Sequence, residues 1–133
     1  MAVKAIAKGV SISPRKVRVV ASLVRGRTVA DAVTILDHTP RRAALAVKKA
    51  VQSAAANAEH NHNLKPGTLS IIEISVTAGP RLKRFRPASH GRALPFQRKS
   101  SHIRVVVDGE ARPVRGAAAL KPEADQADKK EAK

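Results

Sequence analysis

The sequence lacks cysteine, tryptophan and tyrosine, and it has only two phenylalanines among 133 residues. Without cysteine the chain has no disulfide bonds, no cysteine-ligated zinc and no thiol nucleophile, and it suits a reducing compartment. The scarcity of aromatic rings disfavours a module that reads single strands by stacking their bases, because such modules present exposed aromatic side chains. Contact with a nucleic acid is therefore expected to be mainly with phosphate and sugar.

Long apolar runs are also missing. No stretch approaches the roughly 18 apolar residues of a membrane span, and residues 1–10 lack the uninterrupted apolar segment of a signal peptide. A membrane-active basic helix would need large apolar groups on one face, and the alanine-rich helical segment here lacks them. We therefore expect a cytoplasmic protein without a membrane partner.

One long segment of the chain also lacks negatively charged residues. From Ile74 to Val107 the chain has eight Lys or Arg and no Asp or Glu, within a total net charge of +16. Charged side chains are costly to bury unpaired, so residues 79–102 are not expected to form a packed core. A dense polyanion is the partner that fits best, and nucleic acid is the first candidate. The alternative is a solvated, mobile basic loop.

Apolar spacing and capping residues predict an edge strand at residues 2–12, followed by three helices. The first helix is expected to begin with a Ser13 hydroxyl cap and Pro14, and to end at a left-handed Gly26. The second should run from Thr28 to about Asp37, and the third from Thr39-Pro40 to about Asn61. The expected inner stripes are Val17, Val20, Ala21 and Val24; Val29, Ala32, Val33 and Leu36; and Ala44, Val47, Val51, Ala54, Ala55 and Ala58.

Two alternating, β-branched segments at residues 69–78 and 103–107 are typical of antiparallel partner strands. Roughly two dozen residues separate them, far more than a hairpin loop needs. The simplest solution is a ribbon that projects past the body and is bent or broken near Pro80, Pro87 and Pro95, since proline cannot donate to a ladder.

These elements predict an α+β fold in which three helices pack on a small antiparallel sheet, with a long protruding β-hairpin arm. Residues 1–110 are expected to form a single domain that includes the arm at about 79–102. Residues 111–133 have mixed charge and almost no large apolar side chains, so we expect a disordered C-terminal extension.

Catalytic and metal sites receive little support. His60 and His62 lack a cluster of further ligands, and a polar helix end explains them better than a metal does. No serine lies in an activating motif, and no histidine has an evident carboxylate to orient it. We therefore predict no enzyme activity, no cofactor and no metal.

Four motifs, in order, carry a resemblance to a known family. They are Ser13-Pro14-Arg15-Lys16-Val17-Arg18 with Leu23-Val24-Arg25-Gly26-Arg27; Ala54-Ala55-Ala56-Asn57-Ala58-Glu59-His60-Asn61; Gly79-Pro80-Arg81-Leu82-Lys83-Arg84; and Gly91-Arg92-Ala93 with Ser100-Ser101-His102-Ile103. Together they span about residues 2–108. The ordered set resembles the bacterial large-subunit ribosomal protein L22 family, and it is far more specific than any one basic run.

The resemblance implies a structural constituent of the large ribosomal subunit. Its body would sit on ribosomal RNA at the outer end of the peptide exit tunnel, and its arm would line the tunnel. The implied partners are large-subunit ribosomal RNA, neighbouring ribosomal proteins and the nascent peptide, with no obligate homo-oligomer. Where the family has a more polar return strand, this chain has Leu94-Pro95-Phe96, which leaves the register of the returning strand open.

The resemblance and the charge pattern together nominate residues for contact with RNA. Positive charge at a helix start opposes the helix dipole, so phosphates near the first helix would compensate it, although simple surface charge is the alternative there. The expected RNA-binding residues are Arg15, Lys16, Arg18, Arg25, Arg27, Arg81, Lys83, Arg84, Arg86, Arg92, Arg98, Lys99 and His102. The expected arm tip in the tunnel consists of Lys83, Arg84, Phe85, Arg86, Pro87, Ala88, Ser89, His90, Gly91 and Arg92.

A second class of function is an architectural DNA-binding protein. In such a protein a basic β-ribbon follows the minor groove and a proline, here Pro87 or Pro95, wedges into a base step. The ordered ribosomal motifs argue against it, and so does the need for a dimer to place two arms. Sensitivity to RNase distinguishes the two readings.

Overall fold

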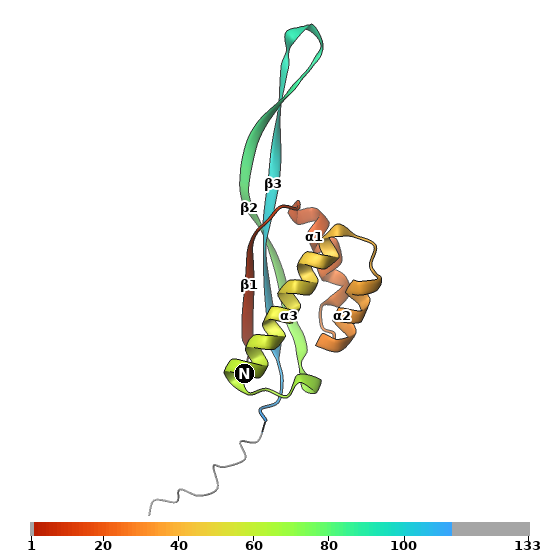
Figure 1. Cartoon of the computed structure of the whole chain (residues 1–133), viewed down its shortest axis with the longest axis vertical. Coiled ribbons are helices and arrows are strands. Elements are labelled where there is room, and N and C mark those ends of the chain that lie inside the picture. The colour runs from red at the N-terminus through yellow and green to blue at the C-terminus, as the bar shows by residue number, and fades with distance from the viewer. Residues whose placement is uncertain (1, 113–133) are drawn as a thin grey trace, which may run out of the picture.

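The computed structural model describes residues 2–112, and its three helices pack on a three-stranded antiparallel sheet (Figure 1). This confirms the predicted α+β fold class. The elements in chain order are β1 (Val3–Val10), α1 (Pro14–Val24), α2 (Val29–His38), α3 (Arg42–His62), β2 (Ser70–Pro87) and β3 (Ala93–Asp108). The predicted C-terminal extension lies almost wholly outside the described residues.

The sheet has the order β1-β3-β2, so the last strand in the chain lies in the middle. Val3 pairs with Val107 on one side of β3, and Ile71 pairs with the same Val107 on the other. The N-terminal segment is thus an edge strand, as predicted. Residues 70–78 and 101–108 are antiparallel partners, also as predicted.

The helices cover one face of this sheet, and the core lies between the two layers (Figure 1). The larger members of the core are fully buried, including Val17 and Val20 of α1, Val47 and Val51 of α3, and Ile103 of β3. The remaining buried residues of α3 are all alanines, and their small side chains let the helix backbone approach the sheet closely. Burying one valine or isoleucine side chain contributes roughly 1.5–3 kcal/mol.

The starts of α1 and α2 differ in whether a side chain caps the helix. The Thr28 side chain accepts a hydrogen bond from the Asp31 amide, which is the predicted cap of α2. Ser13 is at the N-cap position of α1, but its side chain makes no cap bond, so that part of the prediction was wrong. Gly26 follows α1 with φ of +74°, in the predicted left-handed conformation.

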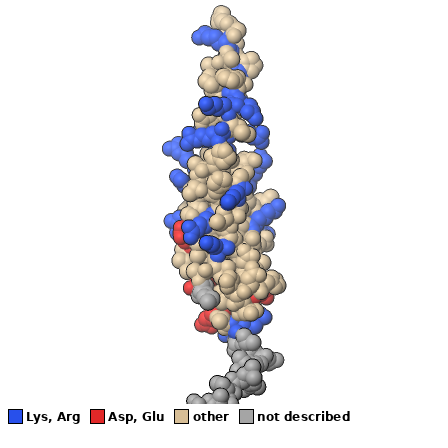
Figure 2. Space-filling model, turned by 90° about the vertical axis from the view of Figure 1, so that its left-hand side faces the viewer, with Lys and Arg blue, Asp and Glu red and all other residues tan. Residues whose placement is uncertain are grey.

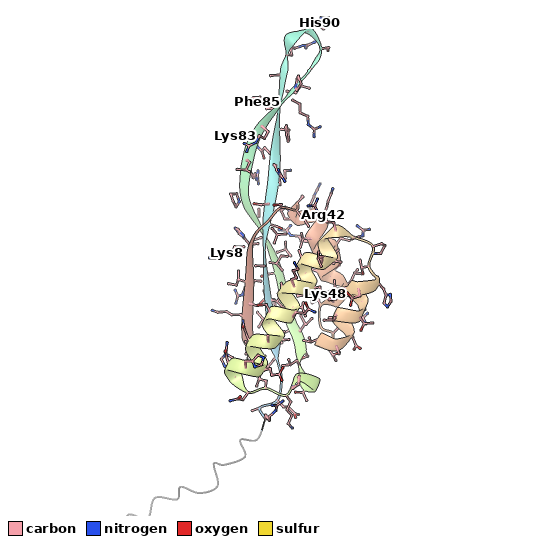
Figure 3. The ribbon with its side chains drawn as sticks, viewed as in Figure 1. Lys8, Arg42, Lys48, Lys83, Phe85 and His90 are labelled. Carbon is pink, nitrogen blue, oxygen red and sulfur yellow. The ribbon has the colours of Figure 1, made fainter. Side chains whose placement is uncertain are left out.

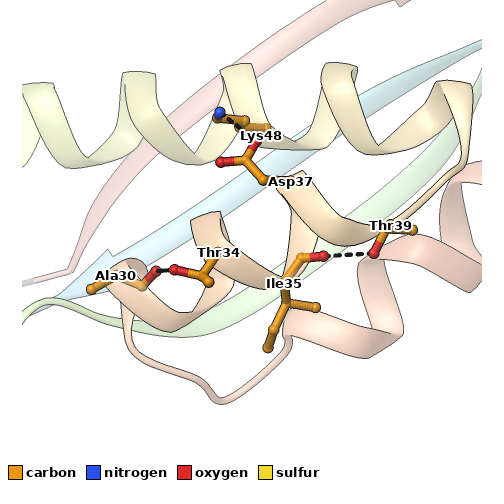
Figure 4. Close-up of polar contacts among 6 residues, drawn as sticks. All are labelled: Ala30, Thr34, Ile35, Asp37, Thr39 and Lys48. Atoms are coloured by element: carbon orange, nitrogen blue, oxygen red, sulfur yellow. Dashed lines mark hydrogen bonds and ion pairs between the residues drawn. The ribbon is translucent and has the colours of Figure 1, made fainter.

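The prediction that Thr39-Pro40 opens the third helix was also wrong, because α3 begins at Arg42. Thr39 instead closes α2: its hydroxyl donates to the Ile35 carbonyl at 2.7 Å (Figure 4). The same view shows the Lys48 ammonium of α3 against the Asp37 carboxylate of α2, an ion pair that ties the two helices together.

Beyond the body, β2 and β3 continue as a two-stranded ribbon (Figure 1). This ribbon, residues 79–100, is called the arm below. Its ladder runs in unbroken register from Arg81 opposite Lys99 to Pro87 opposite Ala93. The ladder continues without a break at Pro95, whereas an irregularity does occur near Pro80, as a register shift between Ala78 and Arg81. A two-stranded ribbon tolerates proline because each strand has an edge with no further strand to pair.

No helix within residues 2–112 combines the length and the apolar character needed to cross a bilayer.

Candidate nucleic-acid interface

The arm gathers the predicted cationic residues of the second half of the chain along one ribbon. Within the described part of the protein, none of its Lys or Arg side chains forms an ion pair with Asp or Glu. Figure 2 shows blue side chains spaced along the arm, whereas red ones are seen only on the body. The cations that fall in this ribbon are Arg81, Lys83, Arg84, Arg86, Arg92, Arg98 and Lys99.

The regular ladder assigns these side chains to two faces, because opposed residues in an antiparallel pair point to the same side and alternate along each strand. One face carries the pairs Arg81/Lys99, Lys83/Gln97, Phe85/Pro95 and Pro87/Ala93. It is called the odd face. The even face carries the pairs Leu82/Arg98, Arg84/Phe96 and Arg86/Leu94. On the even face the Arg86 guanidinium lies 4.7 Å from the centre of the Phe96 ring.

The end of the arm is a tight turn rather than a long loop. His90 and Gly91 both have positive φ, 58° and 65°, and the Ala88 amide donates to the Arg92 carbonyl at 2.7 Å. Figure 3 places His90 at the extreme tip, with Phe85 and Lys83 further down. The predicted tip residues 83–92 are therefore brought together at the far end of the ribbon.

Close backbone contacts fix the base of the arm, where β1 ends and three strands become two. A Cβ on Gly79 would lie 2.6 Å from the Ser100 hydroxyl oxygen and 3.2 Å from the Ser100 carbonyl carbon, so a side chain there would require Ser100 to shift. The Ser100 hydroxyl donates to the Pro80 carbonyl at 2.6 Å. His102, a predicted RNA contact, accepts a hydrogen bond at Nδ1 from the Gly9 amide, which leaves its Nε2 side for another partner.

Arg18 of α1 and Arg25, the residue directly after this helix, have a role that sequence reasoning missed. Arg18 donates through Nε and Nη2 to the Val76 carbonyl, and Arg25 donates through Nη2 to the Ile74 carbonyl at 2.9 Å. Both carbonyls belong to β2, an edge strand of the sheet. These contacts satisfy exposed edge acceptors and join α1 to the strand that becomes the arm. A guanidinium has five N–H donors, so both side chains keep donors for phosphate.

A second cationic group lies where α1 and α3 begin, at the end of the body nearest the arm. A shallow groove there is lined by Lys16, Arg41 and Arg42 together with Ser11, Ile12, Ser13 and Ala43. Figure 3 shows Arg42 at this end of the body. Neither helix has an acidic residue in its first turn. Sequence reasoning nominated Arg15 and Lys16 but missed Arg41 and Arg42, which lie beside Lys16 only once α1 and α3 pack together.

Paired charges lie elsewhere on the body. Lys65 faces Glu110 at 3.6 Å, and Arg112 faces Glu59 at 3.8 Å. Arg27, another nominated RNA contact, is exposed in the turn after α1 and donates through Nε to the Leu23 carbonyl of that helix. No group of three His, Asp or Glu side chains within residues 2–112 is placed to hold a metal ion.

The arrangement can neutralise a folded polyanion along its length, and it has no feature of a catalytic centre in the part of the chain described. Comparison with protein-family models gives a match over residues 5–108 to the family described as ribosomal protein L22p/L17e. The matched residues include all three helices, the whole arm and all of the sheet except Val3 and Lys4.

Proposed function

Because the chain belongs to the ribosomal protein L22p/L17e family, whose members are structural proteins that bind large-subunit ribosomal RNA, we propose that its arm lines the nascent-peptide exit tunnel. In this proposal the body sits on the surface of the ribosomal RNA, and the arm extends inward between RNA segments. The tip residues 83–92 then lie closest to the nascent peptide.

The observation that carries the proposal is that the arm is strongly positive and has no buried residue of its own. None of residues 79–100 is buried, and the arm holds seven cations without a carboxylate. A ribbon without a core gains little from its own packing, and its positive charges repel one another. RNA phosphates on both sides would neutralise these charges and hold the ribbon in place.

The body supplies the second part of the interface. The proposed contacts are the nominated residues of α1 and its following turn, Arg15, Lys16, Arg18, Arg25 and Arg27, with Arg41 and Arg42 added from the groove. Residues 1–110 act as one RNA-binding domain in this scheme. The arm residues Arg81 to Lys99 and the free side of His102 complete the set.

The family implies a location on the ribosome and, in general, in the cytoplasm. The further partners that we propose are neighbouring ribosomal proteins and the nascent peptide, with one copy per subunit rather than an obligate homo-oligomer. The protein's role is to hold RNA and to shape a passage.

The first test separates cell lysate on a sucrose gradient after a moderate-salt wash, with and without RNase, and follows the chain by mass spectrometry. Co-migration with the large subunit that RNase abolishes is the expected result. Migration with DNA that survives RNase would refute the proposal and support an architectural DNA-binding protein instead.

A second test addresses the division between body and arm. Deletion of residues 83–92, with a short Asn-Gly turn in their place, removes no buried side chain. The variant is expected to keep the circular dichroism of the body and to join the large subunit, whereas a photo-crosslinker placed at His90 of the full-length arm should react with a stalled nascent peptide. Loss of the folded body in the deletion variant would contradict the division, and a full-length arm whose tip gives no crosslink to the nascent peptide would contradict the tunnel placement.

A further inference from the structure

Both phenylalanines of the chain lie in the arm, and the structure gives them different surroundings. Phe96 is partly covered, because the Arg86 guanidinium lies over its ring. Phe85 is 71% exposed, the highest value among the large hydrophobic side chains of the described residues. Within residues 2–112, no cation–π contact covers the Phe85 ring.

The register places the two rings on opposite faces of the ribbon. Phe85 is on the odd face, directly opposite Pro95, and the next pair on that face toward the body is Lys83 with Gln97. Since alternate residues of a strand are about 7 Å apart, the Lys83 ammonium reaches the surroundings of the ring easily. The odd face therefore presents a flat, exposed ring, a rigid proline beside it, and a cation within reach.

We propose that Phe85 stacks against an unpaired nucleobase of ribosomal RNA, with Lys83 contacting a phosphate of the same or the adjacent nucleotide. The inference rests on the proposed function, and it names the kind of RNA contact that the odd face makes. Aromatic rings stack on bases of every sequence, because every base has a π-face, and cations alongside hold the backbone.

Charge favours a nucleotide over an apolar peptide segment as the occupant. The arm has no carboxylate, and the pair that follows Lys83/Gln97 toward the body is Arg81/Lys99. A peptide segment would leave these three cations without counter-charge, whereas a stacked nucleotide brings its own phosphates. The proposal also revises the expectation from composition, because one exposed ring on the arm suffices for a single stacking contact.

The test measures binding of the full chain to transcribed large-subunit ribosomal RNA at fixed salt. Phe85→Ala is expected to raise Kd about 5- to 150-fold, the range found for loss of one stacked base. Phe85→Tyr should restore binding to within about threefold, whereas Phe85→Leu, which keeps apolar area without a ring, should not. Leu94→Ala is the matched control, since Leu94 is 59% exposed on the even face and should change Kd by less than about twofold.

Chemical probing of the RNA bases provides an independent readout. In the complex with the wild-type chain, one unpaired base is expected to be protected, and Phe85→Ala should expose that base and no other. Binding that is equal for the wild type and Phe85→Ala would overturn the stacking proposal while leaving the proposed function intact. Equal binding of Phe85→Leu would also overturn it and indicate an apolar contact. Failure of the wild-type chain to bind this RNA would overturn both.

Discussion

Removal of four arm cations should reduce the salt dependence of RNA binding by an amount that the structure allows us to estimate. Each phosphate contact contributes roughly 0.7 to 0.9 to the slope of log K against log salt. With about eight cationic groups of the arm and body in contact with phosphates, the slope for the wild type is about −6 to −7. Substituting Arg81, Lys83, Arg98 and Lys99 with glutamine should reduce its magnitude by about 3.

The assay is fluorescence anisotropy or filter binding with large-subunit ribosomal RNA between 50 and 200 mM KCl. Over this fourfold change in salt, the wild-type affinity should fall by about 10⁴-fold and that of the quadruple variant by about 10²-fold. None of the four side chains is buried, so the fold should be unaffected.

The matched control replaces Lys65 and Arg112, which are paired with Glu110 and Glu59, and should change the slope by less than about 0.5 because these cations already have counter-charges. The reasoning is refuted if the quadruple variant keeps the wild-type slope, or if the control loses as much slope as the arm variant does.

Two stability predictions follow from local geometry. Gly79→Ala should destabilise the chain by about 1–3 kcal/mol in urea unfolding, because the new Cβ would meet the Ser100 side chain and backbone. Gly67→Ala is the control and should cost less than about 1 kcal/mol, because nothing lies within 4 Å of a Cβ at that position. Equal effects of the two substitutions on the free energy of unfolding would contradict the close approach at Gly79. Thr28→Ala should cost about 1 kcal/mol through loss of the α2 cap, and Ser13→Ala should cost much less because Ser13 makes no cap bond. Thermal unfolding of the pair would contradict the assignment if Ser13→Ala lowered Tm as much as Thr28→Ala does.

The regular elements could be predicted because their signals are local. Helical spacing identified the buried stripe of α1 without error, and Val17, Val20, Ala21 and Val24 are its buried residues. The start of α3 could not be placed from the same rules. Thr39 is adjacent to a proline, which imitates a helix start, but its hydroxyl donates to the Ile35 carbonyl of the preceding helix, and Arg41 is the N-cap residue of α3.

The residue types of the candidate site could be predicted from the sequence, but the contacts and faces of its side chains could not. A run of cations without carboxylates is visible in the sequence, and so is the need for an anionic partner. The contacts of Arg18 and Arg25 with β2 join residues 58 and 49 positions apart, and no local pattern reports such pairs. The two faces of the arm depend on the register between strands, which the sequence left open because of the prolines. In the structure Pro95 pairs with Phe85 in regular register, without a break.

The central position of β3 has a mechanical consequence. This one strand of 16 residues, roughly 50 Å long at the usual rise per residue, extends from the arm's end to the far side of the body. Its inner part, Ile103, Val105 and Val107, is completely buried between the helices and the neighbouring strands. The arm is thus a cantilever clamped in the hydrophobic core. A sideways force on its end produces a bending moment that the core must resist, so the stiffness of the arm is set by the packing of the body.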